Sequence, residues 1–191
     1  MVLALGVPSV IVLLFAHIIA TNMKITVKDA IVTLFGICYV VGFILYIPLL
    51  FGIENGRFLI WYLLLAAWGT DTFAYIIGVM FGKHKFTKVS PKKSVEGSVA
   101  GIVGAVGICL AYTFAINHYT DMNISYWHIA IVSAVLSVLS QIGDLSASTI
   151  KRHVGIDDFG SLLPGHGGIL DRIDSIIFIA PFAYFLLMVL I

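Results

Sequence analysis

The last third of the chain gathers charged residues, glycines and a histidine within a sequence that is otherwise mostly apolar. The side chains in this cluster that could do chemistry are Ser148, Lys151, Arg152, Asp157, Asp158, His166, Asp171, Arg172 and Asp174. Carboxylate oxygens are ligands for a hard cation such as Mg²⁺. Lysine and arginine side chains bind phosphate groups. The combination is suited to holding a metal and phosphates, which indicates an enzyme rather than a scaffold.

Glycines surround His166 in the segment Leu163-Pro164-Gly165-His166-Gly167-Gly168. Glycine adopts backbone conformations that other residues resist, so its amide groups can approach an anion closely. A helix beginning near Gly168 would direct its positive end to the same place, with Asp171 and Asp174 on one face. Two alternatives stay open: the segment is a tight re-entrant corner, and His166 only forms hydrogen bonds.

A polar stripe precedes this cluster on a predicted membrane helix. Its members recur at steps of three and four residues, and they are Ser137, Ser140, Gln141, Asp144, Ser148 and Lys151. This spacing places the side chains on one helix face. Serines alone would indicate helix packing, whereas the added carboxylate and the lysine at the helix end favour a binding site.

Asp71 is a further acidic residue within an apolar stretch. It lies about ten residues, or roughly 15 Å, from the end of its predicted helix. An aspartate at that depth costs about 2.5 to 3.5 kcal/mol to insert. Asp71 therefore either lines a polar cavity or is protonated and hydrogen-bonded between helices.

The loop that follows, residues 82–94, carries five lysines, which are Lys83, Lys85, Lys88, Lys92 and Lys93. The sequence from Ser90 through Ser94 to Glu96-Gly97 is typical of a helix start. Hydroxyl and ammonium groups at such a start are placed to meet phosphates. The alternative is that the lysines only set the orientation of the chain in the membrane.

Composition predicts an integral membrane protein, because 60% of the 191 residues are hydrophobic, 11% are charged and the mean hydropathy is +1.07. We expect a single domain over 1–191 with six membrane helices, at Val2–Ala20, Ala30–Phe51, Phe58–Phe81, Val95–Asn117, Tyr126–Ile150 and Ser175–Ile191. The net charge of +1 and the absence of a basic arm argue against a nucleic-acid partner. Cys38 and Cys109 are expected to be small buried apolar residues.

The basic residues predict the orientation of this all-α membrane protein. Arg57 falls on one side of the predicted helices, and the other ten are Lys24, Lys28, Lys83, Lys85, Lys88, Lys92, Lys93, Lys151, Arg152 and Arg172. The positive-inside rule places the polar loops 82–94 and 151–174 in the cytoplasm and both termini outside.

These motifs together resemble those of the phosphatidate cytidylyltransferases, also called CDP-diacylglycerol synthases. The matching segments are Asp71-Thr72-x-Ala74-Tyr75, Gly78, Phe81-Gly82-Lys83, Ser90-Pro91-Lys92-Lys93-Ser94-x-Glu96-Gly97, Gln141-Ile142-Gly143-Asp144-Leu145, Ser148-x-Ile150-Lys151-Arg152, Asp158, Gly160, Leu163-Pro164-Gly165-His166-Gly167-Gly168 and Asp171-Arg172-Ile173-Asp174. The resemblance covers the C-terminal two thirds of the chain, and the first two helices match only in character.

The resemblance implies that CTP and phosphatidate react to give CDP-diacylglycerol and pyrophosphate. It implies Mg²⁺ held by Asp144 and Asp171, with K⁺ as an optional second ion, and places Lys151 and Arg172 with these two as catalytic residues. The implied substrate-binding residues are Asp71, Ser90, Lys92, Lys93, Ser148, Arg152, His166, Gly167, Gly168 and Asp174. It also implies a homodimer in the cell membrane (inner or plasma membrane), with the active site facing the cytoplasm.

The chain departs from the family pattern in two ways. Asp157-Asp158 stands where the family has Lys-Asp, which reverses one charge beside the implied phosphate site. The chain is also shorter than family members, which carry further N-terminal helices. Two alternative functions stay open: a CTP-dependent transferase acting on an ether lipid or polyprenol, and an ion or proton transporter using Asp71 and Asp144. The glycine-rich loop argues against the transporter.

Overall fold

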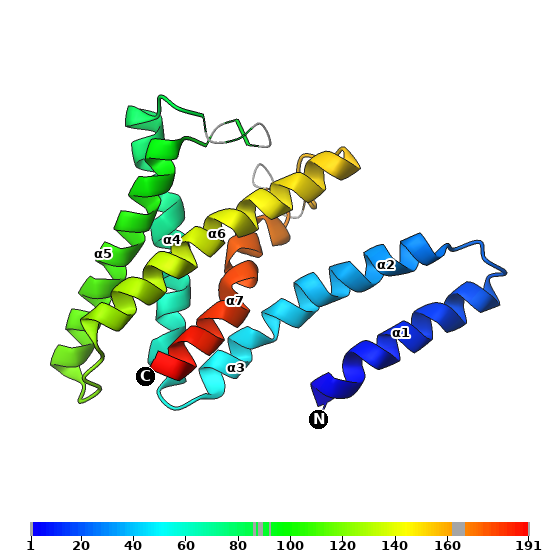
Figure 1. Cartoon of the computed structure of the whole chain (residues 1–191), viewed down its shortest axis with the longest axis horizontal. Coiled ribbons are helices and arrows are strands. Elements are labelled where there is room, and N and C mark those ends of the chain that lie inside the picture. Colours follow the sequence, from blue (N-terminus) through cyan, green and yellow to red (C-terminus); the bar gives the residue numbers. More distant parts are fainter. Residues whose placement is uncertain (1, 86, 88–89, 92, 162–166, 191) are drawn as a thin grey trace. The chain divides into compact units, whose positions relative to one another are not determined.

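The computed structural model describes residues 2–85, 87, 90–91, 93–161 and 167–190, and within them the chain is helical with no strand. The elements in chain order are α1 (Val2–Ala20), α2 (Val27–Gly36), the π-helical turn η1 (Ile37–Gly42), α3 (Tyr46–Gly52), α4 (Gly56–Phe81), α5 (Val95–Tyr119), α6 (Tyr126–Val154) and α7 (Leu170–Leu190). Figure 1 shows this order from blue to red. The predicted all-α class is confirmed.

The chain divides into two compact units, Met1–Leu45 and Tyr46–Ile191. The first holds α1, α2 and η1. A capping box starts α2, in which the Thr26 backbone N–H donates to Asp29 Oδ2 at 2.8 Å and the Asp29 N–H donates back to Thr26 Oγ1 at 3.3 Å. The second unit holds α3 to α7 and every residue predicted for the site.

Five helical segments are long and apolar enough to cross a membrane, and they are Val27–Gly52, Gly56–Phe81, Val95–Tyr119, Tyr126–Val154 and Leu170–Val189. Gly6–Ala20 is a shorter apolar helix. The prediction of a multi-pass membrane protein with about six helices is confirmed. The last helix begins five residues earlier than the predicted Ser175, at Leu170. Acidic side chains favour the positive end of a helix, so Asp171 and Asp174 lie inside its first turns.

Helices α4 and α5 pack closely through glycine. A Cβ added to Gly101 would lie 2.9 Å from the Thr70 carbonyl oxygen, and one added to Gly97 would lie 2.6 Å from the Ala74 carbonyl oxygen. Small residues let membrane helices approach at backbone distance. This contact places Thr70 and the neighbouring Asp71 beside the first turns of α5.

The core of the second unit joins α4, α6 and α7 through fully buried apolar side chains such as Leu63, Leu136 and Ala180. Gly143 on α6 admits Phe178 of α7, since a Cβ at Gly143 would lie 2.6 Å from the Phe178 Cβ. Tight packing here fixes the end of α6 against the beginning of α7.

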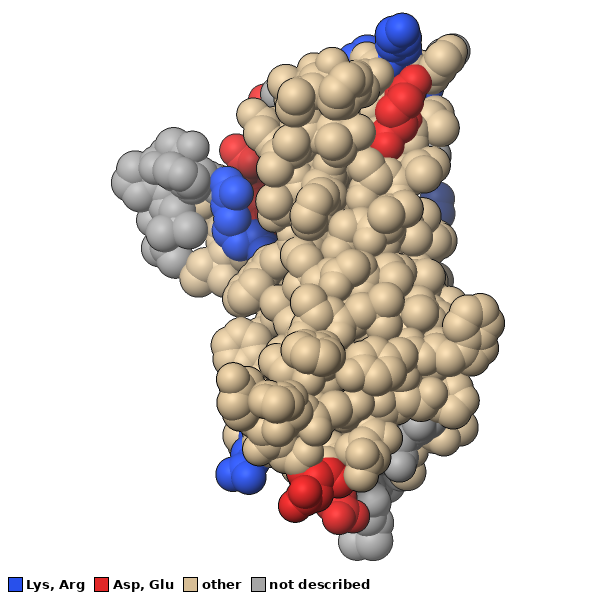
Figure 2. All heavy atoms as spheres, turned by 90° about the vertical axis from the view of Figure 1, so that its left-hand side faces the viewer, with Lys and Arg blue, Asp and Glu red and all other residues tan. Residues whose placement is uncertain are grey.

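The loops from α4 to α5 and from α6 to α7 lie at the same end of the second unit (Figure 1). This follows because α4 and α6 run toward that end and α5 and α7 run away from it. On the face that carries α5, charged side chains lie in the upper part of the view and at its bottom, with an uncharged band between them (Figure 2). Such a band is the surface expected of a protein embedded in lipid.

The glycine contact yields a stability test. Gly101→Leu should lower the free energy of unfolding by about 1 to 3 kcal/mol, because the new side chain must separate α4 from α5. Gly107→Leu is the matched control, since a Cβ at Gly107 meets nothing within 4 Å. Thermal unfolding in detergent checks the pair. An equal melting temperature for the two variants would contradict the close α4–α5 packing.

Candidate active site

Hydrogen bonds join the beginning of the loop after α4 to the start of α5. His84 Nδ1 lies 2.6 Å from Glu96 Oε1, and the His84 backbone N–H donates to the Glu96 carboxylate at 3.3 Å. The Val95 N–H donates to the His84 carbonyl at 2.9 Å, and Lys85 forms an isolated antiparallel β-bridge with Ser94. These contacts, which we call the His84–Glu96 clasp, hold the two ends of the loop together.

The predicted start of α5 is confirmed. Ser94 is its N-cap, and its hydroxyl accepts a hydrogen bond from the Gly97 N–H at 3.1 Å. Cap and clasp together fix the backbone on the C-terminal side of Lys93. That lysine therefore leaves the loop from an anchored position.

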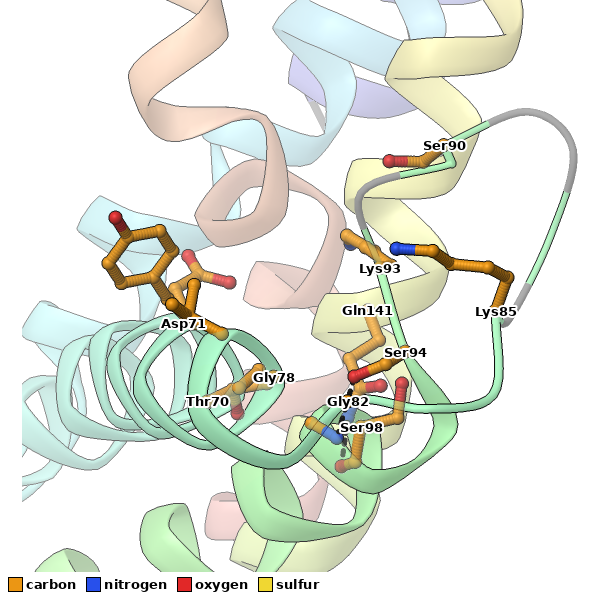
Figure 3. A pocket seen from close by; sticks show the side chains of 14 residues that line it. Thr70, Asp71, Gly78, Gly82, Lys85, Ser90, Lys93, Ser94, Ser98 and Gln141 are labelled. Carbon is orange, nitrogen blue, oxygen red and sulfur yellow. Dashed lines mark hydrogen bonds between the residues drawn. The ribbon is translucent and has the colours of Figure 1, made fainter.

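A cavity of about 570 Å³ lies beside this loop. Helix α4, the loop, the start of α5 and Gln141 of α6 line it, and its polar or charged lining residues are Thr70, Asp71, Tyr75, Lys85, Ser90, Lys93, Ser94, Ser98 and Gln141. In Figure 3, Asp71 projects from α4 on one side, while Lys85 and Lys93 project from the loop on the other. The cavity thus presents amino groups opposite a carboxylate.

Helix α6 carries the predicted polar stripe along this region. Ser137 is fully buried and accepts a hydrogen bond from Thr70 Oγ1 at 2.7 Å, and Gln141 Nε2 donates to the Ser98 carbonyl at 3.1 Å. Ser140 is also fully buried, and its hydroxyl has no hydrogen-bond partner within the described part of the chain. The stripe therefore faces other helices and not lipid.

Asp144, one helical turn further along α6, forms an ion pair with Lys93 of the loop. The side chains are 28% exposed for Lys93 and 32% for Asp144, so both reach solvent. Asp71 and Asp174 each lie within electrostatic range of Asp144. Carboxylates from α4, α6 and α7 thus lie near one another, and Asp144 is the one that pairs with Lys93.

Asp171 on α7 is held by three donors. Lys151 Nζ lies 2.7 Å from Asp171 Oδ1, and the backbone N–H groups of Phe159 and Gly168 each donate to Oδ2 at 2.9 Å. The Asp171 side chain is only 6% exposed, and Lys151 Nζ also lies 5.4 Å from the centre of the Phe159 ring. These contacts fix the end of α6 to the start of α7.

The glycines near Asp171 are required by close contacts. Gly167 has φ +79°, and a Cβ there would lie 2.9 Å from Asp158 Oδ1. A Cβ at Gly168 would lie 2.9 Å from the Gly160 nitrogen and 3.2 Å from Asp171 Oδ2. The amide group that was expected to approach an anion here contacts the carboxylate of Asp171.

The other predicted residues occupy several positions. Arg152 donates to Asp157 Oδ1 at 2.9 Å, with side chains 64% and 90% exposed. Asp174 is buried, and its Oδ1 accepts the Ser175 N–H at 2.7 Å. Ser148 is half-buried and Arg172 is exposed. Lys92 and His166 lie outside the described residues.

The structure thus brings most predicted residues into two neighbouring groups. The cavity group contains Asp71, Ser90, Lys93 and Asp144, and the second group joins Lys151 to Asp171 and the glycines. Lys85 was missed as a site residue, although its place in a lysine-rich loop before a helix cap was a usable signal. The His84–Glu96 clasp had no sequence signal of its own.

A divalent cation is compatible with these carboxylates. Among the described residues, no three histidine, cysteine or acidic side chains lie close enough together to form a metal site. Mg²⁺ does not need such a group, since it binds one or two protein carboxylates and completes its shell with water and substrate phosphates. Asp144 offers a partly exposed carboxylate, and Asp171 offers one whose Oδ1 contacts Lys151.

Comparison with known proteins adds a family to this geometry. Residues 2–190 match the model of the "Cytidylyltransferase family". Proteins named phosphatidate cytidylyltransferase from Staphylococcus haemolyticus and Staphylococcus saprophyticus are 37% and 39% identical over 177 residues, which are 92% of this chain and 65% of theirs. One from Bacillus subtilis is 43% identical over 135 residues, or 70% of this chain and 49% of that protein. The chain belongs to the cytidylyltransferase family.

Proposed function

We propose that this chain transfers the cytidylyl group of CTP to phosphatidate, forming CDP-diacylglycerol and pyrophosphate. Two lysine–carboxylate pairs at one end of a membrane helix bundle carry the proposal. The similarity over 92% of the chain to proteins named phosphatidate cytidylyltransferase supports it. These names favour phosphatidate over an ether lipid or polyprenol as the acceptor.

The chemistry explains why cations must be fixed in advance. An oxygen of the lipid phosphate forms a bond to the α-phosphorus of CTP, and the bond to the β-phosphate bridge breaks, so its electron pair leaves with pyrophosphate. Several negative charges converge in this step, and pre-positioned cationic groups stabilise them. Lys93 and Lys151 are held in place for this role, and Lys92, Arg152 and Arg172 add positive charge along the same segments.

The remaining predicted residues have supporting roles in the proposal. Asp71 keeps the cavity polar, Ser90 lines it, and Ser148, His166, Gly167, Gly168 and Asp174 complete the substrate site. Asp144 and Asp171 would hold Mg²⁺, with K⁺ as an optional second ion. When bound, the cation would offset the negative charge of the triphosphate.

We further propose that the loops 82–94 and 155–169 face the cytoplasm of a bacterial cell, where CTP is available. The ten-to-one distribution of basic residues supports this orientation. Arg57 lies in the first turn of α4, at the end opposite the lysine loop. The family resemblance is the support for a homodimer in the cell membrane.

The direct test is an assay of the purified protein with radiolabelled CTP, phosphatidate and Mg²⁺. We expect label in a lipid product, with deoxy-CTP and alternative lipid phosphates as competitors that define the substrate class. Labelling of another lipid phosphate but not of phosphatidate would overturn the proposed acceptor. No labelled lipid with any acceptor would overturn the transferase.

The two carboxylates give a second test. Asp144→Asn and Asp171→Asn should each lower the turnover number by about a hundredfold or more, as expected when charge stabilisation at a reacting phosphate is lost. Asp121→Asn is the control, because Asp121 is exposed at the opposite end of α5. Melting temperatures separate lost chemistry from lost folding, since Asp171 also binds two backbone amides. Full activity in either variant would contradict the assignment.

The contact between Arg152 and Asp157 gives a third test. Asp157→Lys should lower the KM for CTP by about two- to fivefold, because it releases Arg152 and adds a cation, and exposed pairs are weak. Asp157→Asn releases Arg152 without adding charge, so a smaller decrease is expected. Steady-state kinetics check both variants. An unchanged KM in Asp157→Lys would mean that this position is a solvated bystander.

A further inference from the structure

Each carboxylate proposed for the cation is paired with a lysine proposed for phosphate. Lys93 contacts Asp144, and Lys151 contacts Asp171. Without bound ligands, the carboxylates of the cation site and the lysines of the anion site therefore neutralise each other's charge. A lysine that is shared in this way links the binding of one ligand to the binding of the other.

The two pairs differ in what else holds them. Asp171 keeps two backbone N–H donors on Oδ2 whatever happens at Oδ1. Asp144 forms an ion pair with Lys93. Within the described part of the chain, no backbone amide donates a hydrogen bond to its carboxylate. The Lys93–Asp144 pair is the one suited to exchange partners.

Lys93 also faces the cavity in which an anion would be bound. An anion there attracts the Lys93 amino group and weakens its hold on Asp144. Asp144 then keeps its negative charge beside Asp71 and Asp174, which lie within electrostatic range of it. An unpaired carboxylate beside other negative charges makes binding of another cation more favourable.

We propose that Lys93 makes nucleotide binding and divalent-cation binding mutually dependent, by neutralising Asp144 until a triphosphate takes its place. This inference rests on the proposed function, because it assumes that CTP binds near Lys93. Linkage requires the effect to be reciprocal. Removing Lys93 should strengthen cation binding without nucleotide, and removing the charge of Asp144 should strengthen nucleotide binding without cation.

The cation arm uses Mn²⁺, which shares the oxygen preference of Mg²⁺ and is detected by electron paramagnetic resonance. The protein in nanodiscs is titrated with Mn²⁺ in the absence of nucleotide. Lys93→Gln should bind Mn²⁺ at least about fivefold more tightly than Lys85→Gln, the lower end of known coupling effects. Lys85 lines the same cavity and forms no ion pair within the described residues, so it controls for the loss of one charge. Lys93→Arg should bind Mn²⁺ with the affinity of wild type, because it keeps the positive charge beside Asp144.

The nucleotide arm measures CTP binding by calorimetry in EDTA. Asp144→Asn should bind CTP at least about fivefold more tightly than wild type, because Lys93 is then free to meet phosphate. Asp121→Asn, at the other end of the bundle, should match wild type. Both arms measure binding without lipid and without turnover, and neither depends on a catalytically active variant.

Two results would overturn the coupling while leaving the transferase intact. One is equal Mn²⁺ affinity in Lys93→Gln and Lys85→Gln, and the other is metal-free CTP affinity in Asp144→Asn no higher than in wild type. If wild type bound neither CTP nor Mn²⁺ under any condition, the proposed function would fall together with the coupling.

Discussion

An ionised carboxylate within a membrane-spanning helix is expensive, at about 2.5 to 3.5 kcal/mol on insertion scales, unless a cation or polar partner compensates. In this protein Asp144 meets Lys93, and Asp171 meets Lys151 and two backbone amides. The helix packing and the loop contacts of the second unit bring each lysine to its carboxylate. A helix bundle without them would hold unpaired charge at the same depth.

The position of Lys93 depends first on glycines in α5. Gly97 and Gly101 allow α5 to approach α4 at backbone distance. The loop between them therefore joins two helix ends that lie close together. The His84–Glu96 clasp then closes the base of that loop. Lys93 is left beside the cavity, within reach of α6. Small residues in the helices and one exposed polar contact thus control the position of a charged group.

Much of the fold was predictable because the membrane imposes simple rules. Apolar length identified the helices, and three- and four-residue spacing identified the α6 stripe, whose residues Ser137 and Ser140 are fully buried. The last membrane span was predicted to begin at Ser175, five residues too late, because Asp171 and Asp174 interrupt the apolar run. Their partners lie elsewhere in the chain, and only the folded structure reveals them.

The pairings within the site were not predictable for the same reason. Residue types marked Lys93 and Asp144 as candidates, but they lie on different elements and their contact depends on how the loop folds. Lys85 was missed because its place in a lysine-rich loop fits a cavity lysine and a lysine that sets topology equally well. The amide of Gly168 was expected to approach an anion from outside, and it binds Asp171.

The central claim is that Lys93 exchanges a carboxylate for a phosphate. The most direct measurement is the position of its amino group in an experimental structure of the protein with CTP bound in nanodiscs. We expect Lys93 Nζ at hydrogen-bond distance from a triphosphate oxygen, about 2.7 to 3.2 Å, and separated from Asp144. A bound triphosphate with Lys93 still on Asp144 would contradict it.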